Sequence, residues 1–160
     1  GVFRAPKDWR PYALASVNPH DLPPAAGNLE YGHVKLREQL GLLSGPVEEF
    51  QKSAEAEHHA MLNMLVKEGY LDADVLEDEL ANENEIVDAL YRGLKGSPCK
   101  LMAASIVDAV GEKRTQNQPG TSNEYPNWRI PLADGDGNVV PLEELFGNAR
   151  LQEIAAIMRG

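Results

Sequence analysis

Two short apolar runs constrain the fold of this chain more than any other feature. Residues 12–17 (YALASV) and 100–107 (KLMAASIV) have the length and composition of buried strands, and mostly helical patterns separate them. Two strands are too few to form a stable sheet alone. Because buried strands separated by helical segments are typical of α/β barrels, we expect the C-terminal part of such a barrel, with the missing strands upstream.

The spacing of apolar residues predicts several helices around these runs. Residues 29–43 have roughly helical spacing, and residues 46–68 have the clearest pattern, with Pro46 suited to the first turn and Gly69 to the stop. We expect Asp72 to cap a short helix that ends at Leu80. The fragment is therefore expected to be mostly helical.

Capping residues predict two more helices, and a turn cluster predicts a hairpin. Asn82, with Glu85 three residues later, resembles a capping box for a helix that runs to about Lys95. Asn148 is expected to cap the last helix. Residues 134–138 (DGDGN) separate two short apolar stretches, which indicates a hairpin near residues 130–140.

Charge and composition exclude several classes of partner. The formal net charge of −10 repels phosphate backbones, so we expect no nucleic acid. No apolar run of about 18 residues is present, so we expect no membrane partner. The one cysteine, Cys99, cannot form an internal disulfide, which favours a cytoplasmic location. The sequence opens at Gly1 without a methionine, and we expect a piece of a longer protein.

We expect neither a metal nor a cofactor. Residues 134–145 begin like a calcium loop, but Val139 stands where the loop needs glycine and Leu145 where it needs glutamate. His58 and His59 are adjacent on a predicted helix, so their side chains point about 100° apart and cannot share one metal ion. Cys99 is expected to be a buried small residue.

His20 and Asp21 are the first candidates for chemistry. They follow directly after the first apolar run, and barrel enzymes place catalytic groups in the loops after their strands. The alternative is that Asp21 caps the following turn.

Two longer motifs extend this observation. Residues 14–27 (LASVNPHDLPPAAG) resemble the seventh-strand motif of amylomaltases, commonly SVTTHDLPPTAG, with Asn18 and Pro19 in place of Thr-Thr. Residues 117–129 (NQPGTSNEYPNWR) are similar to the NxPGT…PNWR segment that follows the eighth strand in the same family. The chain therefore resembles the C-terminal part of 4-α-glucanotransferases, glycoside hydrolase family 77.

The resemblance implies a retaining transglycosylation of α-1,4-glucans on a (β/α)8 TIM barrel. Residues 1–160 would form the C-terminal segment of that barrel, with a helical insertion at about 29–95. In this reading Asp21 is the carboxylate that stabilises the transition state, and His20 binds sugar. Asn117, Pro119 and Gly120 are candidate substrate-loop residues, although a structural Pro-Gly turn is the alternative.

The same segment holds two further residues of interest, and the resemblance implies the partners. Trp128 is interpreted as a structural anchor and Arg129 as a salt-bridged guanidinium, with sugar stacking by Trp128 left open. The implied partners are a maltooligosaccharide or other α-1,4-glucan substrate and the remainder of the parent barrel. No stretch matches the family's nucleophile or acid/base motifs, so residues 1–160 alone should be inactive.

Two other hypotheses stay open at this point. One is a noncatalytic helical domain that binds glucan or another protein, with Asp21 as a cap. The other is a related enzyme of the α-amylase clan with a different linkage specificity. The Pro-Gly-Thr to Asn-Trp-Arg segment favours the glucanotransferase.

Overall fold

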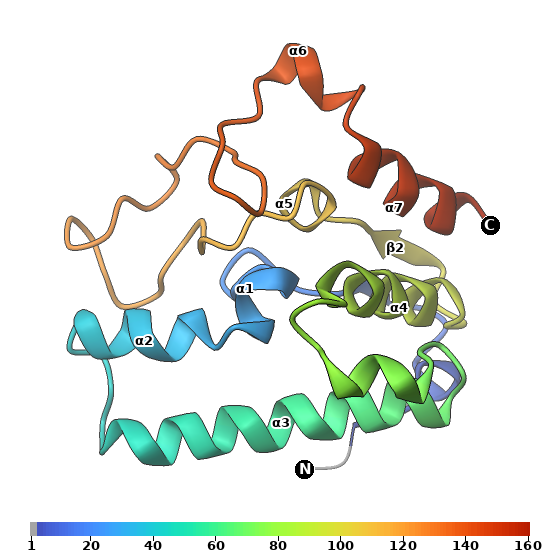
Figure 1. Cartoon of the computed structure of the whole chain (residues 1–160), viewed down its shortest axis with the longest axis horizontal. Coiled ribbons are helices and arrows are strands. Elements are labelled where there is room, and N and C mark those ends of the chain that lie inside the picture. Colours follow the sequence, from blue (N-terminus) through green and yellow to red (C-terminus); the bar gives the residue numbers. More distant parts are fainter. Residues whose placement is uncertain (1–2) are drawn as a thin grey trace.

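The computed structural model describes residues 3–160, and in them helices dominate (Figure 1). The strands are β1 (Leu14–Ser16) and β2 (Leu101–Ala103). The helices are α1 (Ala25–Leu29), α2 (Gly32–Gln39), α3 (Val47–Lys67), α4 (Glu83–Lys95), α5 (Ile106–Ala109), α6 (Leu142–Leu145) and α7 (Ala149–Arg159), with 3-10 turns η1 (Pro6–Asp8) and η2 (Ala73–Glu77).

The strands lie inside the two predicted apolar runs and pair in parallel, with Ala15 opposite Met102. Both are shorter than predicted, and the second run leaves the strand after Ala103 to form α5. The prediction of buried strands was wrong for residues 3–160, since Leu14 is 67% exposed and Leu101 is 63% exposed. A strand is buried only where other layers cover its faces, and here each strand has one neighbour among the described residues.

The predicted helices are confirmed in part. The helix predicted at 46–68 is α3, and the one ending near Lys95 is α4. The helical pattern at 29–43 is broken, because Tyr31 adopts a left-handed backbone conformation with φ of 56° between α1 and α2. The helix predicted from Asp72 to Leu80 is only the 3-10 turn η2.

The two predicted caps had different outcomes. Asn148 caps α7 as predicted, because its Oδ1 accepts a hydrogen bond of 3.0 Å from the Leu151 N–H. The capping box at Asn82 was wrong: the Asn82 amide donates backwards to the Asp78 carbonyl at 2.8 Å and caps nothing. Asn82 Oδ1, the atom that would cap the helix, accepts no hydrogen bond from the first turn of α4.

The predicted hairpin near 130–140 is reduced to one isolated antiparallel bridge between Ala133 and Val139. Asp134 holds this turn, because its Oδ1 accepts from the backbone N–H groups of Asp136 and Asn138 at 3.0 and 2.9 Å. The short helix α6 follows it and was not predicted.

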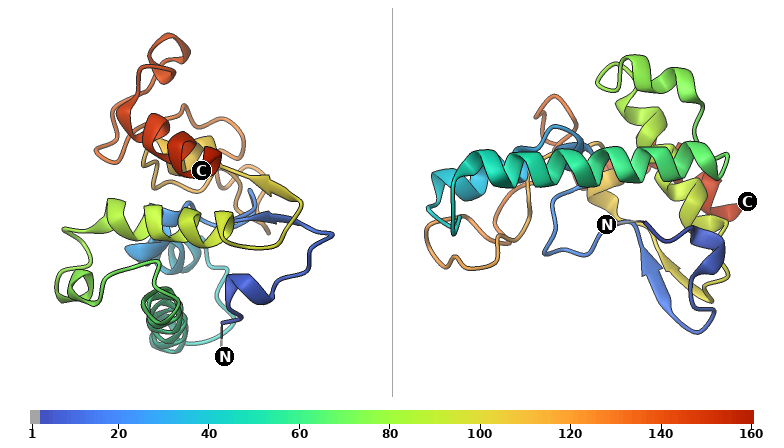
Figure 2. Two further views of the ribbon diagram at one scale, coloured as in Figure 1. Left: turned by 90° about the vertical axis from the view of Figure 1, so that its right-hand side faces the viewer. Right: turned by 90° about the horizontal axis from the view of Figure 1, so that it is seen from below.

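The hydrophobic core surrounds α4. This helix lies between α3 on one side and α7 on the other (Figure 2), and its Ile86, Ala89, Tyr91 and Leu94 are almost completely buried. Leu62 and Leu65 of α3 and Ile154 of α7 belong to the same cluster. Burial of such side chains, at about 1.5–3 kcal/mol each, provides much of the stability that holds the two strands in place.

Candidate functional site

The loops that follow β1 and β2 meet at the carboxyl ends of the two strands. The strands are parallel, so their carboxyl ends point the same way, and the segments that leave them lie close together. The first loop carries His20 and Asp21, and the second segment carries Asn117. The Asn117 side-chain amide donates a hydrogen bond of 2.6 Å to Asp21 Oδ1. Two sequence motifs far apart in the chain therefore form one site.

His20 and Trp128 complete this group of side chains. His20 Nε2 lies 3.3 Å from Asp21 Oδ1, and the His20 ring centroid lies 5.2 Å from that of Trp128 with the planes tilted by 51°. The side chains of His20 and Asp21 are 62% and 52% exposed. The site is therefore open to solvent and accessible to a ligand.

Asp21 does not act as a turn cap within residues 3–160. The turn that contains it is closed by the backbone, where the Leu22 N–H donates to the Pro19 carbonyl at 3.1 Å. Asp21 Oδ1 faces Asn117 and His20, while Oδ2 accepts no hydrogen bond from the described residues. An unoccupied carboxylate oxygen in an open site can accept hydrogen bonds from hydroxyl groups.

A cavity of about 380 Å³ lies beside these side chains. Both loops line it: Pro19, His20 and Leu22 come from the first, and Gln116 and Trp128 from the second. Ring faces and apolar atoms together with a few polar groups are the usual lining of a pocket for a small polar ligand.

The second segment is held by its own hydrogen bonds. Asn127 Oδ1 accepts from the Gln118 N–H at 2.7 Å, and its Nδ2 donates to Thr121 Oγ1 at 2.8 Å. Pro119 and Gly120 lie between these anchors, and both are exposed. Gly120 has a φ of 86°, which favours glycine. Within the described residues no hydrogen bond joins Pro119 or Gly120 to Asp21, and the contact of these two residues with substrate stays a prediction.

Residues 3–160 do not support the interpretation of Trp128 as a structural anchor and of Arg129 as a salt-bridged guanidinium, while sugar stacking by Trp128 stays open. Trp128 is 63% exposed and has a left-handed φ of 60°. Its backbone N–H donates to the Gln116 carbonyl at 2.9 Å, and this bond holds the main chain in place while the ring remains accessible. Arg129 forms no ion pair with a carboxylate in residues 3–160, so nothing there neutralises its guanidinium.

Sequence reasoning missed a buried acid behind the first loop. Asp108 of α5 is 2% exposed, and its Oδ1 accepts from the Ala25 N–H at 2.7 Å and from Asn18 Nδ2 at 3.2 Å. Its Oδ2 accepts from the Tyr91 hydroxyl at 2.8 Å. Burial, followed by the charge of Asp108, raises the pKa of Tyr91 well above its ordinary value. The sequence feature that could have revealed this buried acid is an aspartate inside an apolar stretch, Ile106 to Val110.

A second buried acid, Glu112, fixes the start of the segment that carries Asn117. Its side chain is 1% exposed and forms a two-pronged ion pair with Arg114, at 2.9 and 2.6 Å. It also accepts from the Ala133 N–H at 3.0 Å. Burial by itself raises the pKa of Glu112, but the hydrogen bonds from Arg114 and Ala133 outweigh it, and the pKa lies below its ordinary value.

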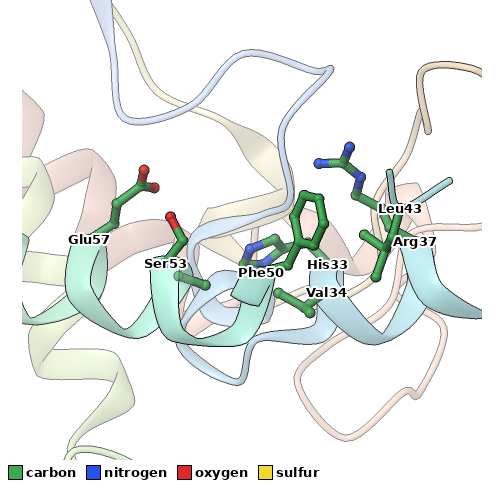
Figure 3. Close-up of a pocket in the computed structure, with 8 residues that line it drawn as sticks. His33, Val34, Arg37, Leu43, Phe50, Ser53 and Glu57 are labelled. Atoms are coloured by element: carbon green, nitrogen blue, oxygen red, sulfur yellow. The ribbon is translucent and has the colours of Figure 1, made fainter. Parts of the chain in front are cut away.

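A separate cavity of about 170 Å³ lies between α2 and α3 (Figure 3). His33 and Arg37 of α2 line it together with Phe50 and Glu57 of α3. Burial, followed by the charge of Arg37, lowers the pKa of His33. None of the residues predicted for the site lies in this cavity.

Residues 3–160 hold no group of three or more His, Cys, Asp or Glu side chains placed to bind a metal ion. The ring centroids of the adjacent His58 and His59 are 5.9 Å apart, with an angle of 81° between the ring planes. His58 Nε2 is hydrogen-bonded to Glu79 Oε2 at 2.5 Å. Cys99 is buried, as predicted. No helix in the described part of the chain is long and apolar enough to cross a membrane.

These features define an α/β protein with a pocket at the carboxyl ends of parallel strands, lined by the rings of His20 and Trp128 and by side-chain amides, with the Asp21 carboxylate next to it in the chain. The model of the glycoside hydrolase family 77, described as 4-alpha-glucanotransferase, matches residues 1–135. The chain belongs to this family, as its two sequence motifs predicted.

Individual relatives agree with this assignment. The chain is 48% identical over 151 residues to the 4-alpha-glucanotransferases of Mycobacterium tuberculosis and Mycobacterium bovis, which covers 94% of this chain and 20% of theirs. It is 28% identical over 155 residues to the Haemophilus influenzae 4-alpha-glucanotransferase, covering 95% and 21%. The chain thus spans about a fifth of the length of these relatives.

A solved structure is also similar. The crystal structure of amylomaltase from Corynebacterium glutamicum superposes with a TM-score of 0.88 at 35% identity, covering 98% of this chain and 23% of that one. The arrangement of helices and parallel strands described above is therefore that of a segment of an amylomaltase.

Proposed function

We propose that this chain is the C-terminal segment of the catalytic (β/α)8 barrel of a 4-α-glucanotransferase. In this proposal β1 and β2 are neighbouring strands of the barrel, and the helices at about 29–95 are an insertion between them. The parallel pairing of β1 with β2 supports this arrangement, because all strands of such a barrel are parallel. The exposed Leu14 and Leu101 are the kind of side chains that further layers would cover. The remainder of the barrel is then the first partner of this segment.

The proposed reaction is the transfer of α-1,4-glucan segments between maltooligosaccharides, without a cofactor. A retaining transfer passes through a covalent glycosyl-enzyme intermediate and needs a nucleophile and an acid/base whose carboxyl groups are about 5–5.5 Å apart. Neither motif was recognised in residues 1–160, so we assign both groups to the rest of the protein. The 160-residue chain by itself should have no transferase activity.

Asp21 is proposed to stabilise the transition state, with His20 as its sugar-binding neighbour. The observation that carries this proposal is the hydrogen bond between Asn117 and Asp21, since it joins the two family motifs in one site. Asn117 orients Oδ1, which leaves Oδ2 for the hydroxyl groups of the transferred sugar. Contacts that tighten as the sugar ring flattens lower the barrier, whereas contacts equal in both states only raise affinity.

The second segment is proposed to line the substrate path. Asn117 would act on the sugar indirectly, by holding Asp21 with its hydrogen bond. Pro119 and Gly120 would shape the loop without donating hydrogen bonds to the substrate. Trp128 offers an exposed ring beside His20, and the CH face of a sugar can pack on such a ring. The cytoplasmic location expected from the sequence stays a prediction.

The test is a maltotriose disproportionation assay on the protein as its gene encodes it. We expect glucose and longer maltooligosaccharides as products. The Asp21→Asn variant should lower kcat by about a hundredfold or more and change KM by less than about threefold, because the carboxylate acts on the transition state. A correctly folded protein that binds maltooligosaccharides and never produces glucose would instead support the noncatalytic glucan-binding alternative.

A further inference from the structure

His20 and Asp21 occupy the tip of an exposed turn, where few neighbouring side chains restrain them. They are the two central residues of the turn that the Leu22 N–H closes on the Pro19 carbonyl at 3.1 Å. Both side chains are more than half exposed. A catalytic carboxylate must be held within a fraction of an ångström of its working position, so the turn needs support from elsewhere.

Asn18 supplies this support at the base of the turn. Its Nδ2 donates one hydrogen bond of 2.9 Å to the Pro23 carbonyl and another of 3.2 Å to Asp108 Oδ1. Both hydrogens of the amide are used. The first bond closes the loop of residues 18–23 across its own ends, and the second attaches the loop to α5.

Asp108 connects both ends of this loop to the hydrophobic core. The same Oδ1 that accepts from Asn18 also accepts from the Ala25 N–H at 2.7 Å, directly after the loop. Oδ2 accepts from the hydroxyl of Tyr91, a fully buried residue of α4. The Tyr91 hydroxyl in turn accepts from the Ser105 N–H at 3.1 Å. Each member of this chain has its partners, so the arrangement is rigid.

We propose that Asn18, held by Asp108, is a positioning residue that fixes the catalytic turn of His20 and Asp21. The proposal rests on the function assigned to Asp21 above. It also gives a reason for asparagine at this position: an amide has two donor hydrogens, whereas the hydroxyl of the threonine found in the related motif has one, and here both donors are in use.

The kinetic test uses the protein as its gene encodes it, with maltotriose as substrate. Asn18→Ala should lower kcat about tenfold and change KM by less than about twofold, since misplacement of Asp21 weakens the transition state more than the ground state. Asn82→Ala is the matched control, because Asn82 makes a comparable amide-to-carbonyl bond to Asp78 and does not line the pocket beside His20. Its kcat should stay at the wild-type value. A rise in KM alone for Asn18→Ala would overturn the proposal.

A double variant separates positioning from general stability. On an Asp21→Asn background, Asn18→Ala should lower kcat by less than about twofold more, because the group that Asn18 positions has lost its function. Losses that multiply in full would show that Asn18 acts independently of Asp21, which contradicts the proposal. If Asn18→Ala does not fold, Asn18→Thr keeps one donor and should show about a threefold loss of kcat.

Hydrogen exchange tests the geometry without any assay of activity. The Leu22 amide, which closes the turn, should exchange about tenfold faster in Asn18→Ala than in the wild type, and at the wild-type rate in Asn82→Ala. Unchanged Leu22 exchange in Asn18→Ala overturns the positioning role. A wild-type protein without disproportionation activity would overturn the proposed function instead. The wild-type assay therefore comes before the assays of the variants.

Discussion

At the scale of single residues, two buried carboxylates behind the site explain why its exposed side chains are ordered. Asp108 holds the turn of His20 and Asp21, and Glu112 holds the start of the segment that carries Asn117. A buried carboxylate is tolerated only when its oxygens are satisfied, and each of these accepts at least three hydrogen bonds or ion-pair contacts. The positions of the exposed side chains of the site thus depend on two buried carboxylates behind them.

Glu112 gives a prediction about pH. Its pKa is lower in the folded protein than in the unfolded chain, so the unfolded chain takes up the proton first as the pH falls. The stability contributed by Glu112 is therefore complete above the ordinary glutamate pKa of about 4.3 and is lost as the pH falls through the lower folded value. Glu112→Gln should cost about 1–3 kcal/mol at pH 7 and flatten this acid dependence.

The measurement is the free energy of unfolding from denaturant titrations at a series of pH values. The control is Glu143→Gln, which removes an exposed carboxylate of α6 that forms no ion pair within the described residues. Its profile should follow that of the wild type. Identical acid dependence in Glu112→Gln and the wild type would show that Arg114 and Ala133 do not lower the Glu112 pKa.

At the scale of the elements, helix ends show where local sequence rules held and where they failed. Asn148 and Asn82 occupy the same N-cap position of their helices, yet only Asn148 accepts a hydrogen bond from the first turn. Asn82 follows the turn at Asp78 and donates to its carbonyl instead. The same residue type therefore serves two different partners, and its neighbours decide which.

This difference predicts unequal effects of the same substitution. Asn148→Ala should lower the free energy of unfolding by about 1 kcal/mol, because the Leu151 N–H loses its partner. Asn82→Ala should change it by less than about 0.5 kcal/mol, as is usual for an exposed contact outside a cap. Denaturant titration of both variants checks the order. Equal losses would contradict the prediction, and a loss near zero for Asn148→Ala would mean that its cap adds nothing to the stability of α7.

At the scale of the molecule, the strand pair is the least covered part of residues 3–160. Leu14 and Leu101 face each other across β1 and β2 and are both largely exposed, and Tyr12 beside them is 93% exposed. Each strand also has one edge without a neighbouring strand among the described residues. Exposed apolar side chains next to free strand edges favour association with further layers or other copies.

We therefore predict that the isolated 160-residue chain self-associates. Light scattering should show a mass that rises with protein concentration, and the double variant Leu14→Lys with Leu101→Lys should reduce it, because like charges facing across the strands oppose further pairing. Lysine at the exposed Leu142 of α6 is the control and should leave the mass unchanged. A chain that stays monomeric at high concentration would contradict the prediction.

Local patterns in the sequence determined several of the elements and part of the site. The three- and four-residue spacing from Val47 onward predicted α3, and the two apolar runs predicted both strands, because these signals depend on neighbours along the chain. The two family motifs singled out His20, Asp21 and Asn117, which the fold brings together. Family membership also followed from these motifs alone.

Only the tertiary structure decided what depends on residues far apart in sequence. The exposure of Trp128, the break at Tyr31 and the bond of Asn82 to Asp78 follow from packing and competing partners, which spacing does not encode. The role of Asp108 is another case: it reads as one aspartate in an apolar stretch until Asn18, Ala25 and Tyr91 are seen around it. A sequence fixes local periodicity, whereas hydrogen bonds between distant segments exist only once the chain has folded.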